Sequence, residues 1–182
     1  MPGEGGSVTV IRPRRQITNY KIGGFRRLSL NYPMQDTRFI ADVMVGKLAR
    51  WLRVLGFDVA YSNKYEDEEI VRIAGAENRI VLTRDTRLAA QKHDTQCLLI
   101  ESGDYKEQIR QVLRSFGLKD FKIFSRCLEC NVALQEVDKE AVFEKVPPYV
   151  YLTQKHFARC PSCDRVYWHG THADKMLEQI RL

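Results

Sequence analysis

Apolar residues in the middle of the chain recur in two alternating patterns, which predict strands alternating with helices. Short apolar runs predict strands at 38–41, 57–61, 79–83 and 96–100. Apolar residues at helical spacing predict helices at 46–55, 67–78 and 105–116, the first ended by Gly56 and the last capped by Asp104. Strands separated by helices imply an α/β fold with an open parallel sheet flanked by helices.

Both ends of the chain depart from this pattern. Residues 1–37 are predicted to be a basic N-terminal extension, either an arm that contacts nucleic acid or a weakly ordered segment. From residue 126 helical periodicity disappears, and a small β module stapled by metal is expected, followed by a short helix at 173–181. The predicted division is therefore 1–37, 38–125 and 126–182.

Composition narrows the class of protein. The chain has 182 residues, of which 44% are hydrophobic and 29% charged, as in a soluble globular protein. Its net charge of +6 favours a polyanionic partner. We expect a cytoplasmic protein without a membrane partner, because the sequence has neither a long apolar segment nor a secretory signal. A Walker loop, a GxGxxG motif and a nucleophilic serine or cysteine motif are also absent from the sequence.

Four of the five cysteines form two CxxC pairs, Cys127 with Cys130 and Cys160 with Cys163. Two such turns can present four thiolates to one tetrahedral ion, so a structural zinc site is predicted. A four-sulfur iron site and two unrelated dithiols are the alternatives. Cys97, within an apolar strand, is expected to be a core residue.

Acidic residues follow the predicted strands. Asp42 comes directly after the first strand and Asp85 after the third, while Asp67 begins the helix after the second. Ligands of open parallel sheets collect at the carboxyl ends of the strands, so these acids are candidate ligands of Mg²⁺ or Mn²⁺. Turn formation and helix capping are the alternative roles for each acid, and capping fully explains Asp104. The neighbouring acids that could replace Asp67 are Glu66, Glu68 and Glu69.

Basic residues lie beside two of these acids in the sequence. Leu48, Trp51, Leu52 and Leu55 form the predicted buried stripe of the first helix. A different face of that helix, together with the sequence around Asp85, carries the candidate phosphate-binding residues, which are Lys47, Arg50, Arg53, Arg84 and Arg87. A solvated helix face with salt bridges is the alternative interpretation.

Five segments of the chain resemble one family in their order and content. They are FIADVMVGKLARWLRVLGFDVAY, YEDEEIVRIA, ENRIVLTRDTRLA, RCLEC and RCPSCDRVYWHGTH. The family is the PIN-like ribonuclease domain found at the C-terminus of mut-seven exonucleases (the Mut7-C RNase domain) and also as a free-standing prokaryotic protein. The resemblance covers about residues 38–180 and leaves out only the N-terminal extension.

The resemblance implies a PIN-like α/β fold followed by a zinc ribbon, with metal-dependent cleavage of RNA. It places the family's acids on Asp42, Asp67 and Asp85, and leaves Asp104 as a weak candidate for a fourth. It matches Lys47, Arg50 and Arg84 to basic positions near that site. It also matches the ribbon ligands to the four paired cysteines, and it includes His169 and His172, for which a structural role is favoured over RNA contact.

The main hypothesis is thus a ribonuclease that uses water activated by a divalent ion. Two alternatives stay open: a non-catalytic module that binds RNA, the ribosome or another RNA particle, and a toxin-like RNase held by a partner protein. RNA substrate, endo- or exonucleolytic action and oligomeric state are not predicted.

Overall fold

The computed structural model describes residues 37–91, 95–168, 170 and 178. The N-terminal extension, the expected terminal helix and both His169 and His172 lie outside these residues, Thr37 and Glu178 excepted. No helix in the described part has the length and hydrophobicity that a membrane crossing requires.

Four parallel strands form the central sheet, in the order β2-β1-β3-β4. Their bounds are β1 Arg38–Ala41, β2 Asp58–Tyr61, β3 Ile80–Thr83 and β4 Cys97–Leu99. The register pairs Phe39 with Val59 on one side of β1 and with Ile80 on the other. Because the chain moves from β1 outward to β2 and then across to β3, the connections diverge between β1 and β3, which is where sheets of this type bind ligands.

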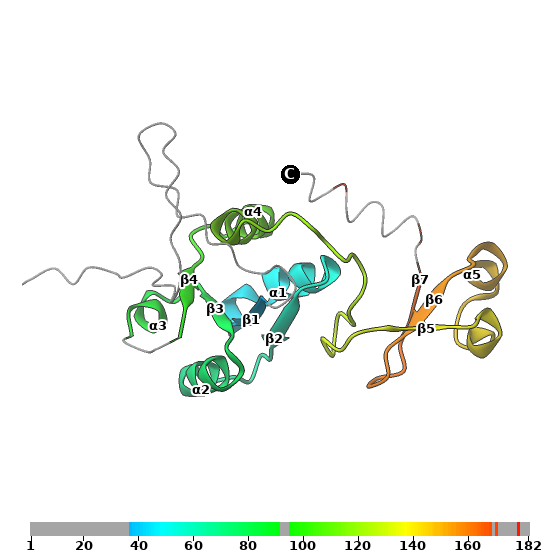
Figure 1. Ribbon diagram of the computed structural model, residues 1–182, viewed down its shortest axis with the longest axis horizontal. Coiled ribbons are helices and arrows are strands. Elements are labelled where there is room, and N and C mark those ends of the chain that lie inside the picture. The colour runs from blue at the N-terminus through cyan, green and yellow to red at the C-terminus, as the bar shows by residue number, and fades with distance from the viewer. Residues whose placement is uncertain (1–36, 92–94, 169, 171–177, 179–182) are drawn as a thin grey trace, which may run out of the picture.

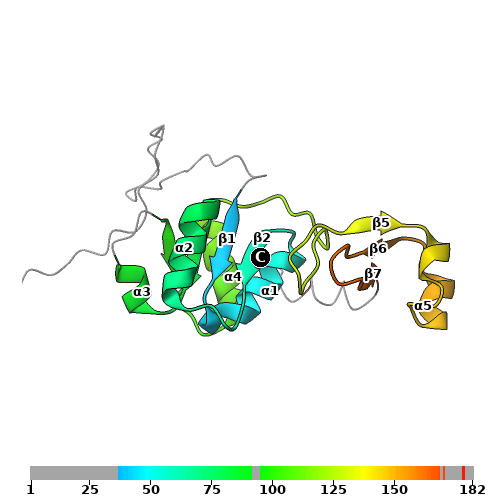
Figure 2. The ribbon, with the colours of Figure 1, turned by 90° about the horizontal axis from the view of Figure 1, so that it is seen from below.

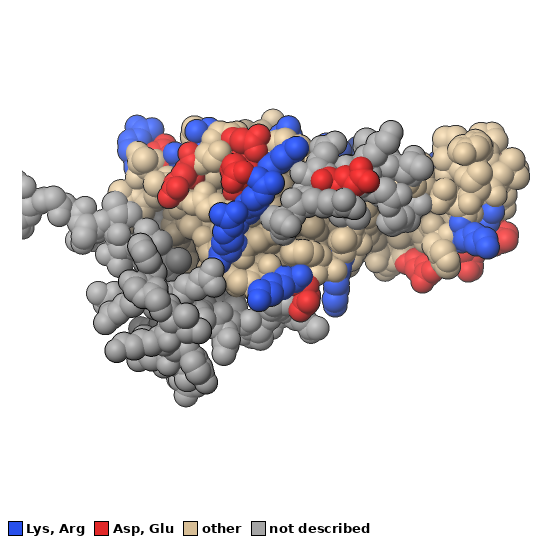
Figure 3. All heavy atoms as spheres, turned by 90° about the horizontal axis from the view of Figure 1, so that it is seen from above, with Lys and Arg blue, Asp and Glu red and all other residues tan. Residues whose placement is uncertain are grey.

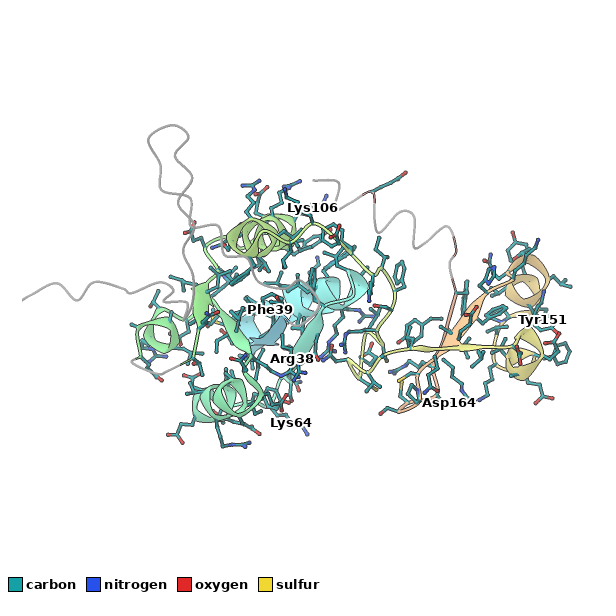
Figure 4. The ribbon with its side chains drawn as sticks, in the orientation of Figure 1. Arg38, Phe39, Lys64, Lys106, Tyr151 and Asp164 are labelled. Carbon is teal, nitrogen blue, oxygen red and sulfur yellow. The ribbon has the colours of Figure 1, made fainter. Side chains whose placement is uncertain are left out.

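Helices cover both faces of this sheet (Figure 1). Alternate side chains of a strand point to opposite faces, so Phe39 packs with α1 (Gly46–Val54) and α4 (Tyr105–Phe116). Ile40 packs on the other face with α2 (Asp67–Glu77) and with Leu88 of α3 (Thr86–Ala90). Figure 4 shows Phe39 between the sheet and the helices α1 and α4. The result is a three-layer α/β/α arrangement.

The ends of these helices follow from a few residues. Gly56 follows α1 with φ of +96°, and a side chain there would overlap the carbonyl oxygen of Lys122. Asp104 caps α4 by accepting hydrogen bonds from the backbone N–H groups of Lys106 and Glu107. Gly117 ends α4 in the left-handed conformation, which costs a glycine little.

The rest of the described chain forms a smaller unit at one end of the molecule (Figure 2). Its antiparallel sheet has the order β5-β6-β7, with β5 at Gln135–Val137, β6 at Phe157–Arg159 and β7 at Val166–Trp168. A 3-10 helix, η2 (Lys139–Val142), and α5 (Pro148–Thr153) connect the first two strands. Val142, Val146 and Phe157 form its buried core.

The structure confirms the predicted α/β class, with its parallel sheet flanked by helices and its separate small β unit. The predicted strands and helices of the larger part occur within about one residue of their expected bounds. Four short helices were not predicted: η1 (Val43–Val45), α3, η2 and α5. The loss of helical periodicity after residue 126 gave no sign of α5, whose first turn contains Pro148, where its fixed φ favours a helix start.

Candidate active site and metal centre

A cleft of about 310 Å³ opens at the carboxyl ends of β1, β3 and β4. Its walls come from η1, the start of α1, the residue after β3, and the loop that leads into α4. The lining residues are Met44, Val45, Lys47, Arg84, Gly103, Asp104, Tyr105 and Gln108. The cleft therefore lies at the crevice that the topology of the sheet predicts.

Asp42 lies buried beside this cleft, with 3% of its surface exposed. Its backbone N–H donates to Leu82 O over 3.0 Å, which extends the ladder between β1 and β3. Its carboxylate accepts hydrogen bonds from the backbone N–H of Met44, the hydroxyl of Thr83 and the N–H of Arg84. A carboxylate has about four lone-pair directions, so Asp42 keeps one acceptor position for a further partner.

Thr83 connects Asp42 to Asp85. The Thr83 hydroxyl donates to Asp42 and accepts from the Asp85 N–H over 2.8 Å. The carboxylate of Asp85 caps α3 and accepts from the N–H groups of Arg87 (2.7 Å) and Leu88 (3.4 Å). The hydrogen bond from the Arg87 backbone is the main reason why the pKa of Asp85 is lowered, so this carboxylate is ionised at neutral pH.

Asp67 and Asp104 are not drawn into this network. Asp67 is exposed at the start of α2, and the Asp104 carboxylate is bonded to the amides of its own helix. Within the described ranges, the four paired cysteines are the only group of three or more His, Cys, Asp or Glu residues that could hold one metal ion. Thr83 thus links the Asp42 carboxylate to the backbone N–H of Asp85, and Asp67 lies outside this network.

Two of the five candidate phosphate-binding residues line the cleft. The Lys47 ammonium lies 3.8 Å from the centre of the Tyr105 ring. The Nε atom of Arg84 is buried and has no hydrogen-bond partner in the part of the chain that is described. Buried guanidinium donors are normally satisfied, and Arg84 lines the cleft, so its guanidinium is a candidate for binding an anionic ligand.

The other three basic residues have partners elsewhere. Arg50 is exposed and its guanidinium lies 3.5 Å from the carboxylate of Glu129, and Arg87 pairs with Asp85 over 3.3 Å. Arg53 corrects the sequence-based expectation. Only 5% of its surface is exposed, and its donors bond to backbone carbonyls rather than facing the cleft. A charged residue in the last turn of an amphipathic helix does not reveal from sequence that it is buried.

Sequence reasoning missed Thr83 and Tyr105. Thr83 is a polar residue at the end of a buried strand, two residues before Asp85, and this position was the available signal. Tyr105 stacks on Trp51 with ring centres 5.5 Å apart and an interplanar angle of 17°. Trp51 is a buried core residue, as predicted. The helical pattern of α1 or of α4 alone does not predict that the two helices pack through these rings.

The four paired cysteines meet at one point, with their sulfur atoms within 4.8 Å of one another. Tetrahedral zinc with Zn–S bonds of about 2.3 Å needs sulfurs about 3.8 Å apart. Cys127 and Cys163 fit this, because their sulfurs are 3.7 Å apart. The donor set and its spacing therefore fit a closed tetrahedral metal site. Cys97 lies apart on β4, where burial raises the pKa of its thiol to about 11.

Both CxxC turns share one backbone design. The N–H groups of Cys130 and Cys163 point at the sulfurs of Cys127 (3.4 Å) and Cys160 (3.5 Å). The next residue in each turn, Asn131 or Asp164, has a positive φ, of 63° and 61° respectively. This conformation closes the turn and aims backbone donors at sulfur, which favours thiolates.

The electrostatics of the cluster favour a cation. Burial opposes ionisation of Cys127, but hydrogen bonds from the Cys130 amide and the Tyr167 hydroxyl lower the pKa of this thiol to about 6. The hydrogen bond shared with Cys163 raises the pKa of Cys130 to about 12. Four thiolates cannot ionise together in so small a space without a positive charge between them.

The first CxxC turn is also joined to the α/β part. Arg53 donates to the carbonyls of Leu128 and Glu129, both over 2.8 Å, and to the carbonyl of Val59. The side chain of Asn131 accepts from the N–H of Val59 (3.0 Å). The turn thereby satisfies the outer backbone groups of β2, an edge strand of the sheet.

An ion-pair network strengthens the same junction. Asn131 donates to Asp58 over 2.7 Å, and Asp58 also pairs with Arg79 over 2.6 Å and with Arg126 over 3.6 Å. Burial alone would raise the pKa of Asp58, but these hydrogen bonds and positive charges lower it. The junction is therefore built from polar groups of both parts.

Comparison with known proteins agrees with this architecture. A family model described as the Mut7-C RNAse domain matches residues 37–180. The human protein "Exonuclease mut-7 homolog" is 35% identical over 106 residues, which cover 54% of this chain and 12% of that protein. The matched segment thus spans about an eighth of that relative's length. No solved structure matches the chain. The match over most of the sequence shows that the chain belongs to the Mut7-C RNase domain family.

Proposed function

We propose that the protein is a ribonuclease that cleaves RNA phosphodiester bonds with the help of Mg²⁺ or Mn²⁺. Family membership supports a nuclease function. The observation that carries the proposal is the Asp42–Thr83–Asp85 network beside a cleft that Lys47 and Arg84 line. Carboxylate oxygens suit these ions, and the basic residues suit the phosphates of the substrate.

In this mechanism each residue has a defined task. Asp42 and Asp85 would hold the divalent ion, and Thr83 would help position them by bonding the Asp42 carboxylate and the Asp85 backbone N–H. When bound, the ion would supply a nucleophilic water and offset the charge of the leaving oxygen. Lys47 and Arg84 hold a substrate phosphate next to the reacting one. Asp67 belongs to the proposal as a third acid, acting from the start of α2.

Cleavage of varied RNAs by wild type, Asp42→Asn and Asp85→Asn, each with Mg²⁺, Mn²⁺ or EDTA, tests the proposal. We expect metal-dependent cleavage that falls on the order of 10²-fold or more in both variants, because each loses a charged ligand. Asp67→Asn tests the third acid, and we expect a smaller loss than in the other two variants because Asp67 lies outside the hydrogen-bond network of Asp42.

Asp120→Asn is the matched control, since it changes an exposed acid in the segment after α4 and should leave cleavage unchanged. Melting curves of all variants separate loss of activity from loss of fold. Cleavage that survives in Asp85→Asn, or that proceeds equally in EDTA, contradicts the proposal.

A non-catalytic RNA-binding module is the second candidate. It is favoured by the capping role of Asp85 and by the three hydrogen bonds that Asp42 accepts, which give both acids a structural purpose. In that case RNA binding should weaken with salt, with log K falling by about 0.7 per phosphate contact, and both Asp→Asn variants should bind RNA like wild type without any cleavage.

We also propose zinc as the ion of the four-cysteine cluster. The tetrahedral spacing and the closed set of four sulfurs support a structural role. Metal analysis of protein purified without added zinc distinguishes this ion from iron.

A further inference from the structure

We propose that Tyr105 is a base-stacking residue that makes the cleft select an unpaired nucleotide, whose phosphate Lys47 and Arg84 hold. This inference rests on the proposed function for the substrate class, an RNA strand. It adds a specificity-determining residue that is separate from the carboxylates. The observations that carry it are the composition of the cleft and the contacts of the Tyr105 ring.

The size of the cleft limits its occupant. Its volume of about 310 Å³ is at the lower end of the roughly 300–1,000 Å³ found for small-ligand sites. A single nucleotide unit is a ligand of that class, whereas a stacked base pair with both backbones is larger. An unpaired base can enter such a cleft, but a base inside a duplex has both faces covered by its neighbours.

Charge in the cleft favours the phosphate of that nucleotide. Lys47 and Arg84 enter from different elements, α1 and the end of β3. The buried Nε of Arg84 lacks a partner among the described residues, and a Cβ placed on Gly103 would lie 3.9 Å from Arg84 Nη2. The guanidinium thus lies against the loop before α4, where Gly103 leaves room at the cleft. The Asp104 carboxylate, the one acid in the lining, is occupied by the amides of its helix.

Tyr105 presents a ring held in a fixed position. Trp51 is buried and stacks on it, which restricts the rotation of the ring. Lys47 lies one helical turn before Trp51 on α1 and places its ammonium 3.8 Å from the ring centre. An aromatic ring and a cation in mutual contact are the two groups that a nucleotide needs, one for its base and one for its phosphate. Binding of a phosphate draws the ammonium from the ring, and the base takes its place.

Among the described candidates for phosphate binding, Lys47 and Arg84 are the two that line the cleft. On the face shown in Figure 3, the described Lys and Arg side chains lie among Asp and Glu rather than forming a continuous basic surface. Arg50, Arg87 and Arg53 have carboxylate or carbonyl partners. Lys47 and Arg84 are therefore the candidates that the described structure leaves for a phosphate in the cleft.

Binding measured without added divalent ions tests the inference separately from cleavage and leaves the metal of the cysteine cluster in place. The probes are a labelled single-stranded oligoadenylate and its duplex with oligouridylate. Wild type should prefer the single strand, and Tyr105→Leu should weaken single-strand binding about tenfold and remove the preference. Tyr105→Phe keeps the ring and should bind like wild type. Arg84→Ala should weaken binding of both probes and lower the salt slope by about 0.7 for the single strand.

Tyr149→Leu is the matched control, because this tyrosine is 76% exposed on α5 and should not affect binding. Wild-type affinity in Tyr105→Leu overturns the inference, as does equal binding of the duplex or no binding by wild type. Loss of cleavage in Asp85→Asn with Tyr105-dependent binding intact supports both proposals, whereas Tyr105-dependent binding without any cleavage overturns the nuclease proposal alone.

A second measurement covers the case in which Tyr105→Leu does not fold. Wild type bound to an oligonucleotide that carries 5-iodouridine is irradiated, and the crosslinked peptide is identified by mass spectrometry. A base stacked on an aromatic ring should crosslink to it, so we expect the adduct on Tyr105. Adducts that form only at other positions overturn the inference.

Discussion

Arg53 shows at the scale of one residue how the two parts of the molecule are held together. Its buried guanidinium bonds to three backbone carbonyls that come from β2 and from the first CxxC turn. Arg53→Ala should lower the free energy of unfolding by about 2–4 kcal/mol, because it leaves these carbonyls without their charged donor. Urea denaturation of Arg53→Ala and of Arg72→Ala, an exposed arginine on α2, checks this. We expect Arg72→Ala to lower the free energy of unfolding by less than about 0.5 kcal/mol. An equally small loss in Arg53→Ala would contradict the role of Arg53 in holding the two parts together.

Asp58 makes the same junction dependent on pH. Its pKa is lowered in the folded protein, so the stability it contributes is present above the unfolded pKa of about 3.9 and is lost as pH falls through the folded value. Asp58→Asn should therefore be less stable than wild type by about 1–3 kcal/mol at pH 7, and this difference should shrink below about pH 4. Denaturation of both proteins at each pH removes the common effect of cysteine protonation. A difference independent of pH would exclude a contribution from the charge.

For single residues, the sequence indicated the positions of the acidic and basic side chains along the strands and helices. It did not indicate their hydrogen-bond partners. Asp42, Asp85, Lys47 and Arg84 could be placed near one another because each follows a parallel strand or begins the next helix. Burial of Arg53 could not be predicted, because the groups that accept its hydrogen bonds are the backbone carbonyls of Leu128 and Glu129, which belong to no sequence pattern and lie far away in the sequence.

Among the elements, α4 offers a separate test of local helix chemistry. Asp104 accepts from two N–H groups in the first turn, at 2.9 and 3.2 Å. Asp104→Ala should destabilise the protein by about 1 kcal/mol, whereas Asp104→Asn should cost little because asparagine caps helices nearly as well. Thermal melting of the two variants measures the difference. Equal losses in both would mean that the charge of Asp104, rather than capping, provides the stability.

Length decides which elements were predictable. α1, α2 and α4 contain enough turns for apolar residues to repeat at helical spacing, and all three were expected. α3 has five residues and α5 has six, so neither completes a recognisable repeat. Their starts depend on single residues, Asp85 and Pro148, whose helix-starting role is clear only once the fold is known.

Across the whole molecule, the exposed surface differs between the two parts. The small β unit exposes large apolar side chains on its outer helices, with Phe143, Tyr149 and Leu152 each more than half exposed. The ring of Tyr151, a residue of α5, lies on the side facing η2 and contacts Phe143 (Figure 4). The core of this unit has few large residues, so it depends on its cysteine cluster for stability more than the α/β part does.

The junction predicts that metal loss reaches beyond the small unit. Each part contains one of the chain's two tryptophans, Trp51 in α1 and Trp168 in β7, so Trp168→Phe leaves a signal from the α/β part alone. In that background, chelation of the metal or Cys130→Ser should lower the melting temperature reported by Trp51 by about 8–16 °C. This shift corresponds to a loss of about 2 kcal/mol in the free energy of unfolding, because the first CxxC turn no longer covers Val59. Cys97→Ser is the control, because it removes a thiol outside the cluster, and this variant should retain the metal in the cluster. An unchanged Trp51 transition after complete metal loss would show that the two parts unfold independently, and that the hydrogen bonds of Arg53 and Asn131 do not couple them.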